Sequence, residues 1–110
     1  MWYAIVAEDM PNSLEKRMAT RPAHLARLQA MQDEARLLLA GPFPSIDNEE
    51  PGDAGYSGSL IVAAFTSLQE AIIWANADPF VVAGVYAKVT VKPFRKTLPV
   101  MPVLPDIEVD

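Results

Sequence analysis

The sequence contains no cysteine and only one histidine among its 110 residues. The absence of cysteine excludes disulfide bonds, zinc sites built from thiolates and cysteine nucleophiles. With one histidine in each chain, a histidine-rich metal centre would need ligands from several subunits. The glycine-rich signatures of dinucleotide and phosphate binding are also missing. We therefore expect no metal and no other cofactor.

Basic residues and long apolar runs are scarce as well. The chain has 9 lysines and arginines against 14 acidic residues, a net charge of −5, and no basic patch that interleaves with aromatic residues. This balance disfavours a nucleic-acid partner. No apolar run reaches the roughly 18 residues of a membrane-spanning helix, and Glu8 and Asp9 come too early for a signal peptide. These absences predict a cytoplasmic protein with no membrane partner.

Hydrophobic residues make up 51% of the chain, enough for the core of one small domain. Apolar runs and alternations predict four strands, and helical spacing predicts two helices and one short helical turn. The strands are expected at residues 2–7, 37–40, 58–65 and 85–94, and the helical segments at 14–19 with 22–35, at 68–77 and at 79–83. This order is typical of an α+β, ferredoxin-like βαββαβ fold, in which two helices cover one face of a four-stranded antiparallel sheet.

The other face of this sheet needs a cover of its own. The first and third strands are apolar on both sides, and the helices can cover only one. We expect a second copy of the chain there, as a homodimer or higher homo-oligomer formed through the sheet face. Residues 43–57 predict an acidic surface loop. Residues 97–110, with proline at every third position from Pro99 to Pro105, predict an extended arm outside a domain of residues 1–96.

His24 lies in the segment expected to form the first long helix. We expect Pro22 to kink or restart that helix, which would place His24 near a helix N-terminus. The partial positive charge there favours a neutral ring that can accept a proton. Residues 25, 28, 32 and 35 share one helical face and are expected to cover the sheet, with His24 beside them. The alternative is a surface or half-buried histidine with no task.

Asp78 directly precedes Pro79, and the pair is typical of a helix start. Asp78 suits the N-cap position, where its side chain accepts a backbone N–H, and Pro79 suits the first helical position. Ser67 followed by Glu70 predicts a second helix start of the capping-box type. From the residues alone, capping is the simpler role for Asp78, because an oxygen engaged by the backbone is less free to orient another side chain.

Four segments of the chain resemble the YciI-like family of the dimeric α+β barrel type. They are SLEKRMATRPAHLARL at residues 13–28, LLLAGP at 37–42, SGSLIVAAF at 57–65 and ADPFVVAGVYAKVTVKPF at 77–94. The resemblance implies the ferredoxin-like fold, a dimer through the sheet face and a catalytic dyad of His24 with Asp78. In such a dyad the carboxylate fixes the tautomer of the ring and stabilises the imidazolium. A few members are described as lyases that act on chlorinated hydroxyquinones.

Three further side chains are candidates for substrate binding. Arg17 and Arg21 could each clamp an anionic group, or could form solvated ion pairs with Glu15 or Asp33. Ser59 could bind substrate, or could be an ordinary strand residue. Two hypotheses for the function follow. One is a small enzyme of lyase or isomerase type with a His24–Asp78 acid–base pair and a small-molecule substrate, and the other is a non-catalytic module that binds a small ligand in the same pocket.

Overall fold

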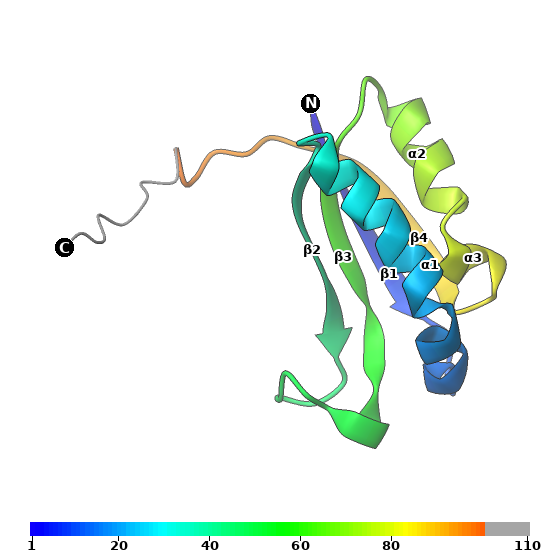
Figure 1. The fold of residues 1–110 in the computed structure, drawn as a ribbon. Coiled ribbons are helices and arrows are strands. Elements are labelled where there is room, and N and C mark those ends of the chain that lie inside the picture. The colour runs from blue at the N-terminus through cyan, green and yellow to red at the C-terminus, as the bar shows by residue number, and fades with distance from the viewer. Residues whose placement is uncertain (101–110) are drawn as a thin grey trace.

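The computed structural model describes residues 1–100 and confirms the predicted α+β, ferredoxin-like architecture (Figure 1). The elements along the chain are β1 (Trp2–Asp9), α1 (Leu14–Asp33), β2 (Leu37–Pro44), the 3₁₀ turn η1 (Gly52–Ala54), β3 (Tyr56–Ala64), α2 (Leu68–Asn76), α3 (Pro79–Val82) and β4 (Tyr86–Phe94). The four strands form one sheet in the order β2-β3-β1-β4, and each neighbouring pair is antiparallel. Residues 95–100 form no helix or strand, and the rest of the predicted arm lies outside the described residues.

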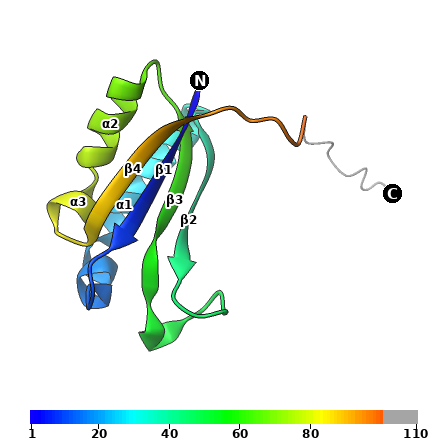
Figure 2. The ribbon, with the colours of Figure 1, turned by 180° about the vertical axis from the view of Figure 1, so that it is seen from behind.

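The helices lie together on one face of the sheet, and Figure 2 shows the opposite face without a helix over it. The core fills the space between the helices and the sheet. Its buried members are contributed by alternate residues of the two central strands and by the inner sides of the helices: Tyr3, Ile5, Leu28, Met31, Ile61, Ala63, Phe65, Ala71 and Ala75. The alternation along β1 and β3 follows from the period of two in a strand, which sends neighbouring side chains to opposite faces.

The first helix differs from the sequence prediction, because α1 runs without a break through Pro22. Proline removes one helical N–H, the partner of the Met18 carbonyl. Pro22 and Met18 are both exposed, so solvent can hydrate that carbonyl. His24 therefore lies in the middle of α1, and the N-terminal placement was wrong. Within residues 1–100, neither α1 nor another helix is long and apolar enough to cross a membrane.

The buried stripe of α1 is also rotated from the predicted one. It consists of Arg17, His24, Leu28 and Met31, while Gln32 is exposed. The spacing of seven, four and three residues keeps these side chains on one face. Two polar residues, Arg17 and His24, thus lie on the buried face of α1. The spacing of the apolar residues alone had predicted that a neighbouring face of the helix would be buried.

The edge strand β2 extends to Pro44, beyond the predicted end at residue 40. Proline is tolerated on an edge strand, where the outward side of the ladder needs no donor. The acidic loop is correspondingly shorter and contains η1. Two predicted helix starts are confirmed: Ser67 Oγ accepts the Glu70 N–H at 3.1 Å, and Asp78 Oδ1 accepts the Phe80 N–H at 2.8 Å.

Candidate functional site

The fold brings together His24 from the middle of α1 and Asp78 from the residue before α3. The Nδ1 atom of His24 lies 2.9 Å from both Oδ1 and Oδ2 of Asp78. Both residues are buried, with 6% and 2% of their surfaces exposed. A buried carboxylate without partners would be costly, so this contact satisfies Asp78 as well as orienting the ring.

Asp78 combines the two roles that the sequence set against each other. Its Oδ1 accepts the Phe80 N–H as an N-cap, while both oxygens face Nδ1 of His24. The ring of Phe80 stacks on the imidazole at 4.0 Å between centroids and 17° between planes. The start of α3 therefore holds the histidine through a carboxylate and an aromatic plane. Because an ionised carboxylate only accepts, Nδ1 is the donor in this contact, and Nε2 is the ring nitrogen left for a ligand.

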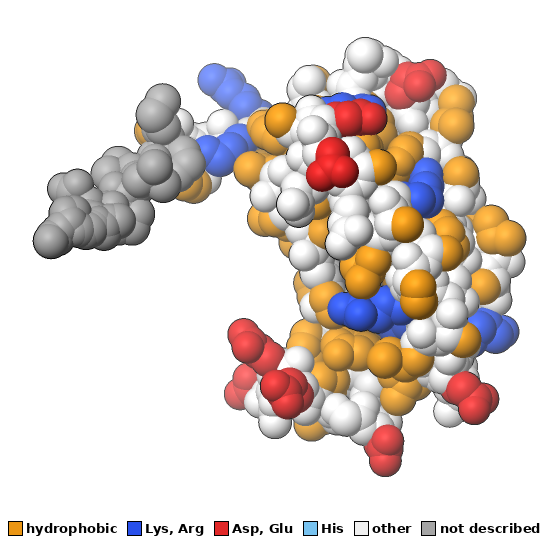
Figure 3. All heavy atoms as spheres, viewed as in Figure 1, with side chains coloured by type: hydrophobic (Ala, Val, Ile, Leu, Met, Phe, Trp, Pro, Cys, Tyr) orange, Lys and Arg blue, Asp and Glu red, His pale blue; other side chains and the backbone are white. Residues whose placement is uncertain are grey.

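His24 lines a pocket of about 400 Å³ between α1 and the β2–β3 half of the sheet. Asp78 does not line this pocket, so of the described residues His24 is the member of the pair that a ligand can meet. The side chains that surround the pocket are mostly apolar, and its polar groups come from α1 and β3. Figure 3 shows this side of the molecule, with basic and apolar side chains in its middle and acidic side chains toward its ends.

Arg17 is buried beside this pair, and its predicted ion pair with Glu15 or Asp33 does not form. Its Nη2 donates to Ser59 Oγ at 2.6 Å and to the Gly58 carbonyl at 3.0 Å. Its Nε lies 3.6 Å from Asp9 Oδ2. The guanidinium also lies over the Phe80 ring, 4.8 Å from its centroid. Ser59 lies in β3, lines the pocket and accepts a hydrogen bond from this buried cation.

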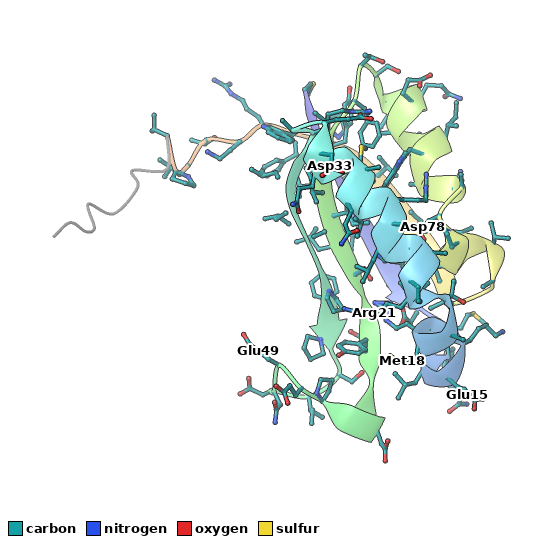
Figure 4. The ribbon with its side chains drawn as sticks, viewed as in Figure 1. Glu15, Met18, Arg21, Asp33, Glu49 and Asp78 are labelled. Atoms are coloured by element: carbon teal, nitrogen blue, oxygen red, sulfur yellow. The ribbon has the colours of Figure 1, made fainter. Side chains whose placement is uncertain are left out.

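Arg21 lies one turn beyond Arg17 on the same helix and is exposed. It lines the pocket, and Figure 4 shows it between α1 and β2, whereas Glu15 and Asp33 lie near the two ends of α1. Within the described part of the chain Arg21 forms no ion pair, so the predicted pairing with these acids is wrong for Arg21 too. The structure therefore brings Arg17, Arg21, Ser59 and His24 to one pocket.

Asp9 and Tyr86 complete a buried polar cluster that the sequence analysis missed. They face each other across β1 and β4 at a register shift. Burial raises the pKa of Asp9, against the opposing effect of the Arg17 charge, and burial likewise raises the pKa of Tyr86 to about 12. The Tyr86 hydroxyl and the Asp9 oxygens have no hydrogen-bond partner among residues 1–100. The one sequence feature that could have indicated this cluster is an acidic residue, Asp9, at the end of an apolar strand.

Among the described residues, no group of three or more histidine and acidic side chains is placed to hold a metal ion. The polar groups at the pocket are instead a histidine with a carboxylate behind it, two arginines and a hydroxyl. Such a set can move a proton at His24 Nε2 and can bind an oxygen-bearing ligand through hydrogen bonds and positive charge.

Comparison with known proteins agrees with this architecture. A family profile described as the YCII-related domain matches residues 1–95. Protein YciI from Escherichia coli O6:H1 is 58% identical over 96 residues, which cover 87% of this chain and 98% of the relative, and protein YciI from Shigella flexneri matches equally well.

One solved structure is similar in fold and in sequence. It is 5-chloro-2-hydroxyhydroquinone dehydrochlorinase (TftG) from Burkholderia phenoliruptrix AC1100, in complex with 2,5-dihydroxybenzoquinone. The TM-score is 0.77 at 28% identity, over 88% of this chain and 96% of that chain. The similarity therefore covers most of both chains.

Proposed function

This chain belongs to the YCII-related domain family, and from that premise we propose that it is a small enzyme of lyase or isomerase type. His24 would act as the general acid–base and Asp78 as the group that orients it. The carrying observation is the 2.9 Å contact of His24 Nδ1 with Asp78, made by a histidine that lines a pocket and an aspartate that lies behind it. The dehydrochlorinase with the same fold is a lyase-type enzyme, which supports this reaction class.

The proposed proton transfer uses the two ring nitrogens differently. Nδ1–H donates to Asp78, so the Nε2 lone pair accepts a proton from a substrate carbon next to a carbonyl group, which stabilises the resulting charge as an enolate. The imidazolium formed is stabilised by the carboxylate. In an elimination, the electron pair of the broken C–H bond forms a double bond as the leaving group departs with its own pair. In an isomerisation, His24 returns the proton to a different carbon.

A non-catalytic binding module is the second candidate, and one observation favours it. The His24 ring is packed between protein groups, with Phe80 stacked on one face and 6% of the residue exposed. Such packing also suits a histidine that only shapes a binding pocket. The two candidates differ in whether removing the imidazole abolishes turnover or only alters affinity.

We also propose that the uncovered sheet face binds a second copy of the chain. This face carries large apolar side chains that are more than a third exposed: Val6 38%, Leu39 46%, Phe43 39% and Phe94 39%. They come from three different strands. The strand register and the alternation of side chains place them on the face opposite the buried Tyr3, Ile5 and Ile61. Several large exposed apolar side chains on one face of a sheet favour an interface there.

The proposed chemistry can be tested with small chlorinated hydroxyhydroquinones and small keto acids as substrates. Chloride release and proton exchange with deuterated water report elimination and proton abstraction separately. Wild type should catalyse at least one of these reactions, and His24→Gln should lower the rate about 10² to 10⁴-fold. Asp78→Asn should lower it less, because the amide oxygen can still accept from Nδ1. Arg95→Gln, on the exposed segment after β4, is the control. Equal rates for His24→Gln and wild type would favour the binding module.

A further inference from the structure

The charge of the pocket is opposite to that of the chain. The sequence has 14 acidic and 9 basic residues, yet Arg17 and Arg21 line the pocket, and no acidic side chain of residues 1–100 does so. Positive groups in a concave site with apolar walls raise the local concentration of anions, because the low-dielectric walls focus the field. The lining thus selects for negative charge within an acidic protein.

The two arginines are not equivalent toward a ligand. Arg17 is 4% exposed, and its Nη1 atom is buried without a partner among the described residues. Its Nη2 is already bonded to Ser59 and to Gly58. A ligand would have to displace neighbouring groups to reach this guanidinium. Arg21 is exposed, is free of ion pairs within residues 1–100, lines the pocket and lies between α1 and β2 (Figure 4).

The remaining walls define the body of the ligand. Leu25 and Leu28 from α1, Leu37 from β2 and Ile61 from β3 form an apolar surface next to His24. A volume of about 400 Å³ accommodates a single ring or a short chain. An apolar body fits these walls, and a charged group at one end of it reaches the arginine.

We propose that the pocket selects an organic anion, with Arg21 as the residue that contacts the charged group. Arg17, whose charge is opposed by Asp9 at 3.6 Å, holds Ser59 in place. The inference rests on the proposed function only in that the reacting carbon would lie at His24. Anion selection itself does not depend on turnover. The aliphatic stem of Arg21 allows its guanidinium to follow ligands of different length, whereas Arg17 is fixed by its contacts with two strands.

Benzoate and benzamide test this inference, because they share a ring and nearly the same shape and differ in charge. Binding is measured by NMR titration at constant ionic strength, since salt screens exposed charges. Wild type should bind benzoate about tenfold or more tightly than benzamide. Arg21→Gln should weaken benzoate about tenfold and leave benzamide unchanged. Arg95→Gln removes the same charge outside the pocket and should change neither.

Several results would overturn the inference. The first is equal affinity of wild type for benzoate and benzamide. The second is no benzoate binding at about 10 mM, a concentration at which a fragment of this size should bind. The third is an unchanged benzoate affinity in Arg21→Gln. Equal weakening by Arg21→Gln and Arg95→Gln would also overturn it, because net charge alone would then explain the preference. His24→Gln should retain benzoate selectivity. Selective binding of benzoate without any catalysis would uphold anion recognition and refute the proposed enzyme. Catalysis without a preference for benzoate would uphold the proposed enzyme and refute anion recognition.

Discussion

Replacement of Asp78 separates its two roles at the start of α3. Asp78→Ala removes both the cap of the Phe80 N–H and the acceptor for His24 Nδ1. Asp78→Ser retains a short side-chain cap but cannot reach the imidazole, which the aspartate contacts at 2.9 Å. Ser67→Ala is the matched control, because Ser67 caps Glu70 and has no second partner in the described hydrogen bonds.

The magnitudes follow from these contacts. Loss of an N-cap costs about 1 kcal/mol, and leaving a buried N–H without an acceptor costs about 1–3 kcal/mol. Asp78→Ala should therefore lose about 2–4 kcal/mol of unfolding free energy, Asp78→Ser about 1–3 and Ser67→Ala about 1. With a urea slope of about 1–3 kcal/mol per molar, the unfolding midpoint of Asp78→Ala should fall by between about 0.7 and 4 M.

Urea unfolding at one fixed protein concentration is the assay, because association would make the midpoint depend on concentration. The single histidine adds a second readout, since its ring nitrogens give the only imidazole signals in a ¹⁵N NMR spectrum. In the neutral ring the hydrogen should reside on Nδ1. Equal losses for Asp78→Ala and Ser67→Ala, or a hydrogen on Nε2, would refute the assigned contact between the carboxylate and the imidazole.

Three other predictions concern the alkaline limit, a close backbone approach and assembly. The Tyr86 pKa is raised from 10.0 to about 12. The contribution of the neutral phenol to the free energy of unfolding is therefore complete below about pH 10 and is lost as the pH rises through about 12. Tyr86→Phe should remove that part of the loss, and ultraviolet titration should lose its latest phenol step. A Cβ on Gly58 would lie 1.9 Å from the Ala7 carbonyl oxygen, so Gly58→Ala should lower the thermal midpoint by about 10 °C or more, whereas Gly41→Ala, with open space, should leave it unchanged. Light scattering should give at least twice the mass of one chain, and a stable monomer would contradict association through the sheet face.

Local patterns were sufficient to predict the order of elements and the caps. The apolar residues of β4 and the Asp78–Pro79 pair are short-range signals, and the structure has a strand and a helix start at these positions, although burial along β4 does not alternate. Pro22 was misleading because proline is unfavourable inside a helix when only local structure is considered, whereas the tertiary packing of α1 offsets that cost. Burial of Leu28 and Met31 against the sheet stabilises one continuous helix across the missing hydrogen bond.

The site could be predicted only in part, since its contacts join distant segments. His24 and Asp78 are 54 residues apart, and family resemblance, not spacing, paired them. Arg17 has no local feature that predicts burial. Its position is set by groups from two strands, Asp9 on β1 and Ser59 on β3. A long-range network of this kind is determined by strand register, which is not encoded within any single stretch of the chain.

Prolines near both borders of the sheet restrict how it can grow. The strands at the borders are β2, which contains Pro42 and Pro44, and β4, which contains Pro93. A proline offers no N–H to a strand that arrives from outside, so lateral extension of the ladder is blocked at these positions. Fibril-like, edge-to-edge polymerisation is thereby disfavoured even though the uncovered face of the sheet carries exposed apolar side chains. Pro42 also lines the pocket, so a residue that offers no N–H to an added strand is at the same time part of the wall that a ligand meets.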